Sequence, residues 1–185
     1  NRDAVAQLLR YNYIPAPNSI WQGIAKLPQA TILTLNSGQT DAKPEAYWSL
    51  AEVAENGQHV GFAGSESDAV EALQNVLSQS VRGQMLADVH LGALLSGGID
   101  SSMVVALMQS QSGRPVKTYS IGFHEKQFDE SGYARDVARH LGTDHTELFM
   151  IAGDVLNAVP NMPRMYDEPF ADSSQLPTSL VMALA

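Results

Sequence analysis

Three apolar, strand-like segments alternate with helical patterns in the second half of the chain, and this alternation constrains the fold more than any other feature. The expected strands are Val89–Leu95, Val116–Ile121 and His145–Ile151. Helical patterns cover about residues 101–111 and 131–141 between them. Strands that alternate with helices are typical of βαβ units, whose strands run parallel and whose crossovers are right-handed. The sequence therefore predicts an α/β fold with a parallel sheet.

A longer helical pattern over about residues 66–86 precedes the first strand. Ser65 is suited to cap this helix, because a serine hydroxyl accepts a hydrogen bond from a free N–H group of the first turn. Apolar residues recur at helical spacing and give this helix one apolar face, formed by Val70, Leu73, Val76, Leu77, Val81 and Met85. The apolar run Met103–Met108 predicts a second helix buried against the sheet, with its methionines in the core.

The first part of the chain has a different character. Turn signals at Tyr13–Asn18 and Leu27–Pro28 precede a β-like segment at Thr31–Leu35. We expect residues 1–58 to be the end of a preceding domain with a linker, and residues 59–185 to be the α/β domain. Since the chain starts without a methionine and stops in an apolar run with no helix-ending residue, we expect a fragment of a longer protein.

The composition excludes several classes of protein. The 185 residues include no cysteine, which rules out a disulfide framework, a thiolate metal site and a cysteine nucleophile. The net charge of −9 and the absence of Lys/Arg clusters argue against nucleic-acid binding. No apolar run approaches the roughly 18 residues that span a bilayer. We therefore expect a soluble, cytoplasmic protein without nucleic-acid or membrane partners.

A glycine-rich turn, Ser96–Ser102, joins the first expected strand to the helix that follows it. Its glycine pair permits positive φ and leaves backbone amides uncovered, while a helix N-terminus adds free N–H groups and partial positive charge. Such a turn can cradle phosphate. Asp100 would repel that phosphate unless it holds a divalent cation, or it caps the helix instead. The glycine pair alone suits an ordinary connecting turn equally well, and the segment matches neither a Walker A loop nor a Gly-x-Ser-x-Gly elbow.

The sequence of the turn also resembles a loop found in a known protein family. Its first six residues, Ser-Gly-Gly-Ile-Asp-Ser, resemble the pyrophosphate loop of ATP pyrophosphatases, and Leu94–Ser102 is similar to the corresponding segment of the glutamine-hydrolysing asparagine synthetase family. Further similar segments follow the same order along the chain: Tyr11–Pro17, Ile24–Pro28, Thr118–Phe123, Phe128–Ala134, His140–His145 and Asp167–Pro177. The resemblance implies an incomplete adenine nucleotide alpha-hydrolase-like (ATP pyrophosphatase) domain, preceded by the tail of a β-rich glutaminase domain.

The resemblance implies a ligase of asparagine biosynthesis. In that family an acid, aspartate in the namesake enzymes, is adenylated by ATP with Mg²⁺ and releases pyrophosphate, and ammonia from glutamine then displaces AMP. A related adenylating synthetase with another acid, β-lactam-forming or glycan- or peptide-amidating, is the first alternative. A nucleotide-binding module without catalysis is the second. The expected ligands are ATP, Mg²⁺, aspartate or a similar acid, and ammonia or glutamine, and a homodimer is the expected assembly.

The resemblance also implies site residues, position by position. The residues expected to hold pyrophosphate are Ser96, Gly97, Gly98, Ser101 and Ser102, with Asp100 on Mg²⁺ and the main chain of Leu95 and Ile121 against adenine. It assigns no catalytic side chain. The family's glutaminase cysteine and its second phosphate loop have no counterpart in these residues, so we expect the fragment itself to turn over neither ATP nor glutamine. We also expect the apolar helix Leu176–Leu184 to promote self-association.

Two further groups of polar residues carry a weaker signal. Asp167, Glu168 and Asp172 could face substrate or metal, but a solvated loop in which Asp172 or Ser173 caps the next helix is favoured, because Asp and Ser are preferred caps. The histidines are too sparse for a zinc site and are expected to be surface or supporting residues; they include His90, His124, His140 and His145.

Overall fold

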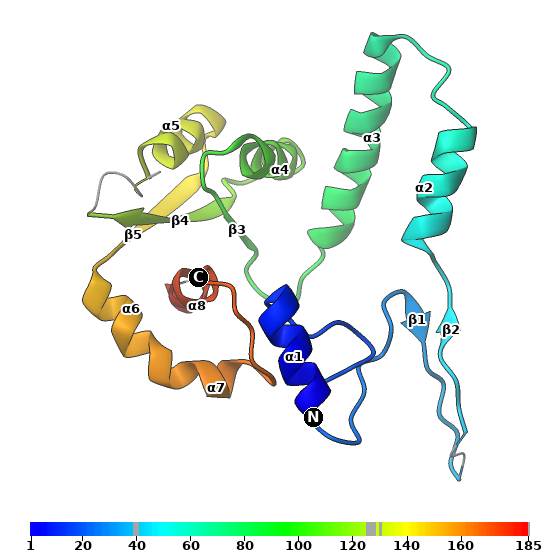
Figure 1. The fold of residues 1–185 in the computed structure, drawn as a ribbon. Helices are drawn as coiled ribbons and strands as arrows, with labels where there is room; N and C mark the ends of the chain where they lie inside the picture. Colours follow the sequence, from blue (N-terminus) through cyan, green and yellow to red (C-terminus); the bar gives the residue numbers. More distant parts are fainter. Residues whose placement is uncertain (39–40, 125–128, 130, 185) are drawn as a thin grey trace. The chain divides into compact units, whose positions relative to one another are not determined.

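A computed structural model of the chain describes residues 1–38, 41–124, 129 and 131–184 (Figure 1). Phe128 and Glu130, which belong to one of the similar segments, and the last residue of the expected domain lie outside the described residues. The chain forms two compact units. Unit 1 comprises Asn1–Ala63 and Asn161–Ser173, and unit 2 comprises Gly64–Pro160 and Ser174–Ala185.

Unit 2 contains a three-stranded parallel sheet with the strand order β3-β4-β5. Its elements are α3 (Glu66–Gln84), β3 (Gly92–Leu94), α4 (Ile99–Ser110), β4 (Lys117–Phe123), α5 (Ser131–Leu141), β5 (Asp144–Met150), α6 (Ala152–Ala158) and α8 (Gln175–Leu184). The 3₁₀-helix η1 (Val159–Asn161) crosses the boundary between the units. The predicted α/β class and the parallel sheet are confirmed.

The first strand is shorter than predicted. β3 begins at Gly92, whose partner in the register is Lys117, the first residue of β4. The apolar residues before Gly92 therefore have no strand to pair with, and Val89 is 79% exposed. In β4, β5 and α5, by contrast, the predicted bounds agree with the structure to within two residues.

The core of unit 2 lies between the sheet and the helices α4 and α5. Leu95, Val105, Ala134 and Ala138 form one buried cluster, against which Ala93, Val137 and Leu141 pack. Alanine side chains let α5 approach the sheet closely. Gly142, at φ +71°, directly follows this helix and ends it. Figure 1 shows α4 and α5 on one face of the sheet and α8 on the other.

The apolar face of α3 is mostly exposed, and the prediction that α4 is buried with its methionines in the core is partly wrong. α3 begins as predicted, because the Ser65 hydroxyl accepts from the Asp68 N–H and the Asp68 carboxylate accepts from the Ser65 N–H. No residue of α3 is buried, however, and Val70, Leu73 and Val76 are each more than half exposed. The reason is that α3 packs mainly against α4 in this unit. In α4, Met108 is buried, but Met103 is 38% exposed because it lies on the side away from the core.

Unit 1 consists of α1 (Arg2–Tyr11), a two-stranded antiparallel pair of β1 (Thr31–Ile32) and β2 (Glu45–Ala46), α2 (Leu50–His59), and the short α7 (Met162–Met165). Only the first two residues of the β-like segment 31–35 form a strand. The return segment Asn161–Ser173 is fastened to the N-terminal part by polar contacts, described below. Among the residues placed in the structure, no helix has the length and apolarity needed to cross a membrane.

Candidate functional site

The turn between β3 and α4 lies directly against the start of α5. Gly97 has φ +80°, in the left-handed region that favours glycine. A methyl group added at Gly97 would lie 2.6 Å from the Ala134 nitrogen and 2.7 Å from the Tyr133 Cβ atom. Glycine is therefore required at this position by the backbone conformation and by the packing of α5, whatever the turn binds.

No contact within the protein requires glycine at position 98. Its φ is −70°, and a methyl group added there would meet only the Ser96 Oγ atom, at 3.4 Å. Gly98 is also the N-cap residue of α4, and no side chain caps this helix. The capping alternative for Asp100 is thus wrong, because Asp100 lies inside the first turn. The N–H groups of that turn have no acceptor within the helix.

The serines of the turn form a small hydrogen-bonded group. The Ser96 and Ser101 hydroxyls are 2.9 Å apart, and the Ser101 hydroxyl donates to the Gly98 carbonyl at 3.2 Å. The Ser102 Oγ atom is buried and has no hydrogen-bond partner among the described residues. A buried hydroxyl without a partner is costly, and Ser102 Oγ is the one buried side-chain oxygen of the turn whose hydrogen-bonding capacity is unused among the described residues.

A cavity of about 470 Å³ opens beside the turn, at the carboxyl ends of β3 and β4, where ligands bind in open α/β sheets. Leu95, Ser96, Ser101 and Ile121, four of the predicted site residues, line it. Gly97, Gly98, Asp100 and Ser102 lie in the same turn and are not among the lining residues. The wall of the cavity is mostly apolar, with hydroxyl groups at the turn.

One wall of the cavity was not predicted. It is formed by α8 and the residue before it, through Ser174, Pro177, Thr178 and Val181. Val181 is 2% exposed. The apolar pattern of this helix predicted self-association, which stays a prediction, and no local signal indicated which surface within unit 2 the helix would cover.

Asp100 is the residue predicted to hold Mg²⁺. Its side chain is exposed and makes no hydrogen bond or ion pair with the described residues. Within the described ranges, no three acidic or histidine side chains are grouped closely enough to hold a metal ion by themselves. Magnesium is commonly held by one or two carboxylates together with substrate phosphates. A single carboxylate beside a turn predicted to bind phosphate fits that pattern.

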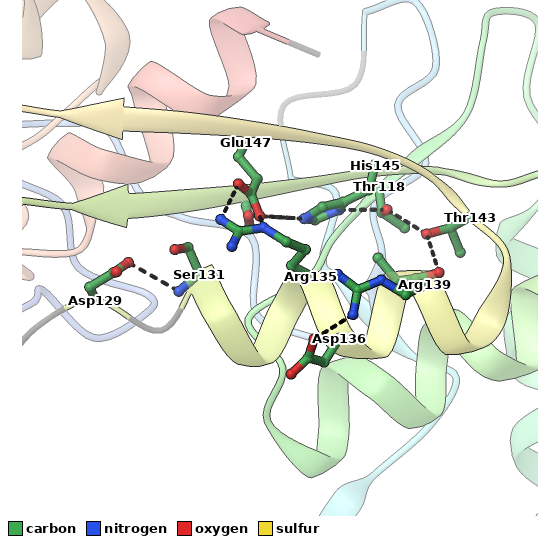
Figure 2. A network of polar contacts seen from close by, with 11 residues as sticks. Thr118, Asp129, Ser131, Arg135, Asp136, Arg139, Thr143, His145 and Glu147 are labelled. Carbon is green, nitrogen blue, oxygen red and sulfur yellow. Dashed lines mark hydrogen bonds and ion pairs between the residues drawn. The ribbon is translucent and has the colours of Figure 1, made fainter. Parts of the chain in front are cut away.

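A polar network lies between the sheet and α5 (Figure 2). His145 Nδ1 is 2.9 Å from Thr118 Oγ1, and His145 Nε2 is 3.2 Å from Ser120 Oγ and 3.6 Å from Glu147 Oε1. Arg135 of α5 donates two hydrogen bonds to Glu147. Burial lowers the pKa of His145, while the adjacent Glu147 carboxylate raises it by a smaller amount. His145 is thus a supporting residue of the fold, as predicted for the histidines.

The acidic cluster before α8 contains a structural ion pair that the sequence did not indicate. Glu168 forms a salt bridge with Lys26 and accepts a hydrogen bond from the Ile20 N–H at 3.1 Å. The Trp21 indole donates to the Asp167 carbonyl at 2.9 Å. Glu168 therefore fastens the return segment of unit 1 and is not part of a solvated loop. Since α8 begins at Gln175, Ser174 directly precedes it, and capping by Asp172 or Ser173 stays a prediction.

Comparison with known proteins gives consistent matches. The Asparagine synthase family profile matches residues 72–185. A putative glutamine-hydrolysing asparagine synthetase of Methanocaldococcus jannaschii is 31% identical over 186 residues, covering 100% of this chain and 35% of the relative. Asparagine synthetase 1 of Bacillus subtilis is 25% identical, covering 98% and 27%, and the human asparagine synthetase is 32% identical, covering 53% and 18%. The chain thus spans about a third or less of the curated relatives it matches.

Proposed function

Because the chain belongs to the asparagine synthase family, we propose that unit 2 is the ATP-binding part of a glutamine-dependent asparagine synthetase. The proposal includes the assignment of residues 59–185 to an ATP pyrophosphatase domain and of residues 1–58 to the end of a glutaminase domain. The observation that carries it is the turn Ser96–Ser102, which opens beside a 470 Å³ cavity at the carboxyl ends of two parallel strands.

In the proposed reaction, a carboxylate oxygen of aspartate attacks the α-phosphorus of ATP. The bond between that phosphorus and the pyrophosphate group breaks, and an acyl-adenylate forms. Ammonia, released from glutamine in the full-length protein, then attacks the acyl carbon, and AMP leaves. The 185 residues contain no cysteine, so they do not supply the thiolate for glutamine hydrolysis, and we expect no turnover of glutamine from them alone.

The residues of the turn have distinct proposed roles. The N–H groups at the start of α4, with Ser96, Ser101 and Ser102, bind the pyrophosphate oxygens. The buried Ser102 hydroxyl, which has no partner among the described residues, gains one in this arrangement. The main chain of Leu95 and Ile121 holds the adenine in the apolar part of the cavity. Asp100 would hold Mg²⁺, which when bound neutralises part of the phosphate charge.

Ser102→Ala tests the proposed site directly. In the free protein this change removes a hydroxyl without a hydrogen-bond partner, so we expect thermal stability to be unchanged or slightly raised. Calorimetry should nevertheless show weaker binding of ATP with Mg²⁺. Ser110→Ala is the matched control, because Ser110 lies at the other end of α4 and its hydroxyl donates to the Leu107 carbonyl. ATP binding that is absent, or equal in both variants and the parent chain, would contradict the proposed site.

The reaction itself is tested on the full-length protein. Release of pyrophosphate from ATP that depends on aspartate supports an asparagine synthetase. Release that depends on another acid supports a related adenylating synthetase. ATP binding without release under either condition supports a nucleotide-binding module.

A further inference from the structure

The position of the phosphate turn depends on the position of α5. Gly97 is in direct contact with the first turn of that helix, and a methyl group at Gly97 would overlap the Ala134 nitrogen and the Tyr133 backbone. Ala134 itself is completely buried. Because no space separates the two segments, a shift of α5 either displaces Gly97 or opens a gap beside it.

An ion pair fixes this part of α5 to the sheet. Arg135, the residue after Ala134, donates from Nε to Glu147 Oε1 at 2.9 Å and from Nη2 to Glu147 Oε2 at 2.7 Å. Two parallel hydrogen bonds define the orientation of a guanidinium group as well as its distance. Figure 2 shows Arg135 extending from α5 toward Glu147 on β5. The Glu147 side chain is 16% exposed and the Arg135 side chain 48%, so the contact is protected from solvent on the side of the sheet.

Other contacts keep α5 folded without this ion pair. Asp129 accepts hydrogen bonds from the Ser131 N–H at 3.1 Å and from the Phe123 N–H at 3.4 Å, which joins the start of the helix to the end of β4. The buried Ala134 and Ala138 hold the helix against the core. The Arg135–Glu147 pair is therefore not needed to form α5. It defines the position of the first turn of the helix relative to the sheet.

We propose that Arg135 and Glu147 are positioning residues for phosphate binding: their ion pair holds the first turn of α5 against Gly97 and so preorganises the turn Ser96–Ser102 for the pyrophosphate of ATP. This inference rests on the proposed function of the turn. It assigns the pair no contact with the ligand. Its effect passes through the backbone of Tyr133 and Ala134, which lies against Gly97.

The test compares ligands that use the turn with one that does not. In Arg135→Met we expect binding of ATP with Mg²⁺, and of pyrophosphate, to weaken about tenfold, at the lower end of ordinary coupling between linked sites. Adenosine, followed by ligand-observed NMR, should bind as to the parent chain, because its base lies at Leu95 and Ile121. A general loss of structure would weaken all three ligands.

Arg139→Met is the matched control. Arg139 lies one turn further along α5 and pairs with Asp136 on the same helix, and both side chains are more than 70% exposed. We expect ATP, pyrophosphate and adenosine to bind this variant as they bind the parent chain. Glu147→Gln keeps the shape of the partner and removes its charge, so it should give the same selective loss. Combined with Arg135→Met, it should add little, because the two residues act as one unit.

The outcomes separate this inference from the proposed function. Selective loss of ATP and pyrophosphate binding in Arg135→Met and Glu147→Gln supports the positioning role. Unchanged ATP binding in both variants, or equal loss of all three ligands, overturns it and leaves the proposed function intact. If Arg135→Met does not fold, Glu147→Gln alone decides. A parent chain that binds neither ATP nor pyrophosphate contradicts the proposed function and this inference together.

Discussion

Thr118 and His145 are directly paired in the register of β4 and β5, and their side chains are joined by a 2.9 Å hydrogen bond between Thr118 Oγ1 and His145 Nδ1. Thr118 Oγ1 is also 2.9 Å from the Thr143 hydroxyl, which lies 3.5 Å from the Ala138 carbonyl. The other ring nitrogen, His145 Nε2, is 3.2 Å from the Ser120 hydroxyl and 3.6 Å from Glu147 Oε1. Both ring nitrogens therefore have polar partners, which fixes the orientation of the imidazole.

The first prediction concerns the pH dependence of folding. Burial lowers the pKa of His145 below the ordinary value of 6.5, with the Arg135 charge lowering it further and the Glu147 charge opposing. When the pH is below 6.5, His145 binds a proton more readily in the unfolded chain than in the folded chain. The free energy of unfolding should therefore fall as the pH decreases through 6.5. Urea denaturation from about pH 8 to about pH 5 measures this dependence.

Two histidine variants isolate the contribution of His145. In His145→Asn the decrease in stability below neutral pH should be smaller than in the parent chain. His140→Asn, which changes an exposed histidine of α5, should retain the parent pH dependence. An identical pH dependence in the parent chain and His145→Asn would show that other groups, not His145, cause it.

The second prediction separates the two glycines of the phosphate turn. Gly97→Ala places a methyl group 2.6 Å from the Ala134 nitrogen at φ +80°, so we expect it to destabilise the fold by at least about 1 kcal/mol. Gly98→Ala fits the free protein, and its Tm should stay close to that of the parent. We expect Gly98→Ala to weaken ATP binding, because a phosphate group that approaches the backbone at Gly98 would meet the added methyl. Thermal unfolding and calorimetry measure the two effects; normal ATP binding by Gly98→Ala would contradict a close approach at this residue.

The third prediction concerns the contact between Gly122 and Phe149. These residues are paired in the register of β4 and β5, and a methyl group at Gly122 would lie 2.5 Å from the Phe149 ring. Gly122→Ala displaces the ring, but Phe149 is 44% exposed and its ring can turn away, so we expect the free energy of unfolding to fall by about 1 kcal/mol, the lower end of the range for overpacking. Adding Phe149→Leu should recover part of this loss. Gly132→Ala, which meets no atom within 4 Å, should be neutral or stabilising in the same denaturation experiment.

Local patterning was sufficient for the regular elements of the sheet. The apolar stripe of α5, ended by Gly142, predicts Ser131–Leu141 because each signal depends only on neighbouring residues. The strand β5 could be predicted for the same reason. The start of β3 could not be predicted from its own residues, because it depends on where the partner strand begins, at Lys117.

The features that could not be predicted from the sequence depend on contacts between distant parts of the chain. Glu168 meets the Ile20 N–H across 148 positions, and no periodic signal records such a pairing. The placement of α8 beside the cavity depends likewise on tertiary packing. The turn Ser96–Ser102 was predicted as a candidate site because its chemistry is contiguous. The dependence of Gly97 on α5 was not, because it involves the backbone of Tyr133 and Ala134.

The last prediction tests Asp100 as the proposed Mg²⁺ ligand. Its exposed carboxylate has no partner among the residues that the structure describes. Asp100→Asn should therefore lower the free energy of unfolding by at most about 0.3–1 kcal/mol, the range of a favourable helix-dipole contact. The effect of Asp100→Asn on ATP binding should have opposite signs in the presence and absence of Mg²⁺. With Mg²⁺ present, losing a ligand should weaken binding. With EDTA, removing a negative charge beside the phosphates should strengthen it. Calorimetry under both conditions measures the difference, with Asp136→Asn on α5 as the control for an exposed aspartate. Equal weakening with and without Mg²⁺ would show that Asp100 supports the turn and does not hold the metal.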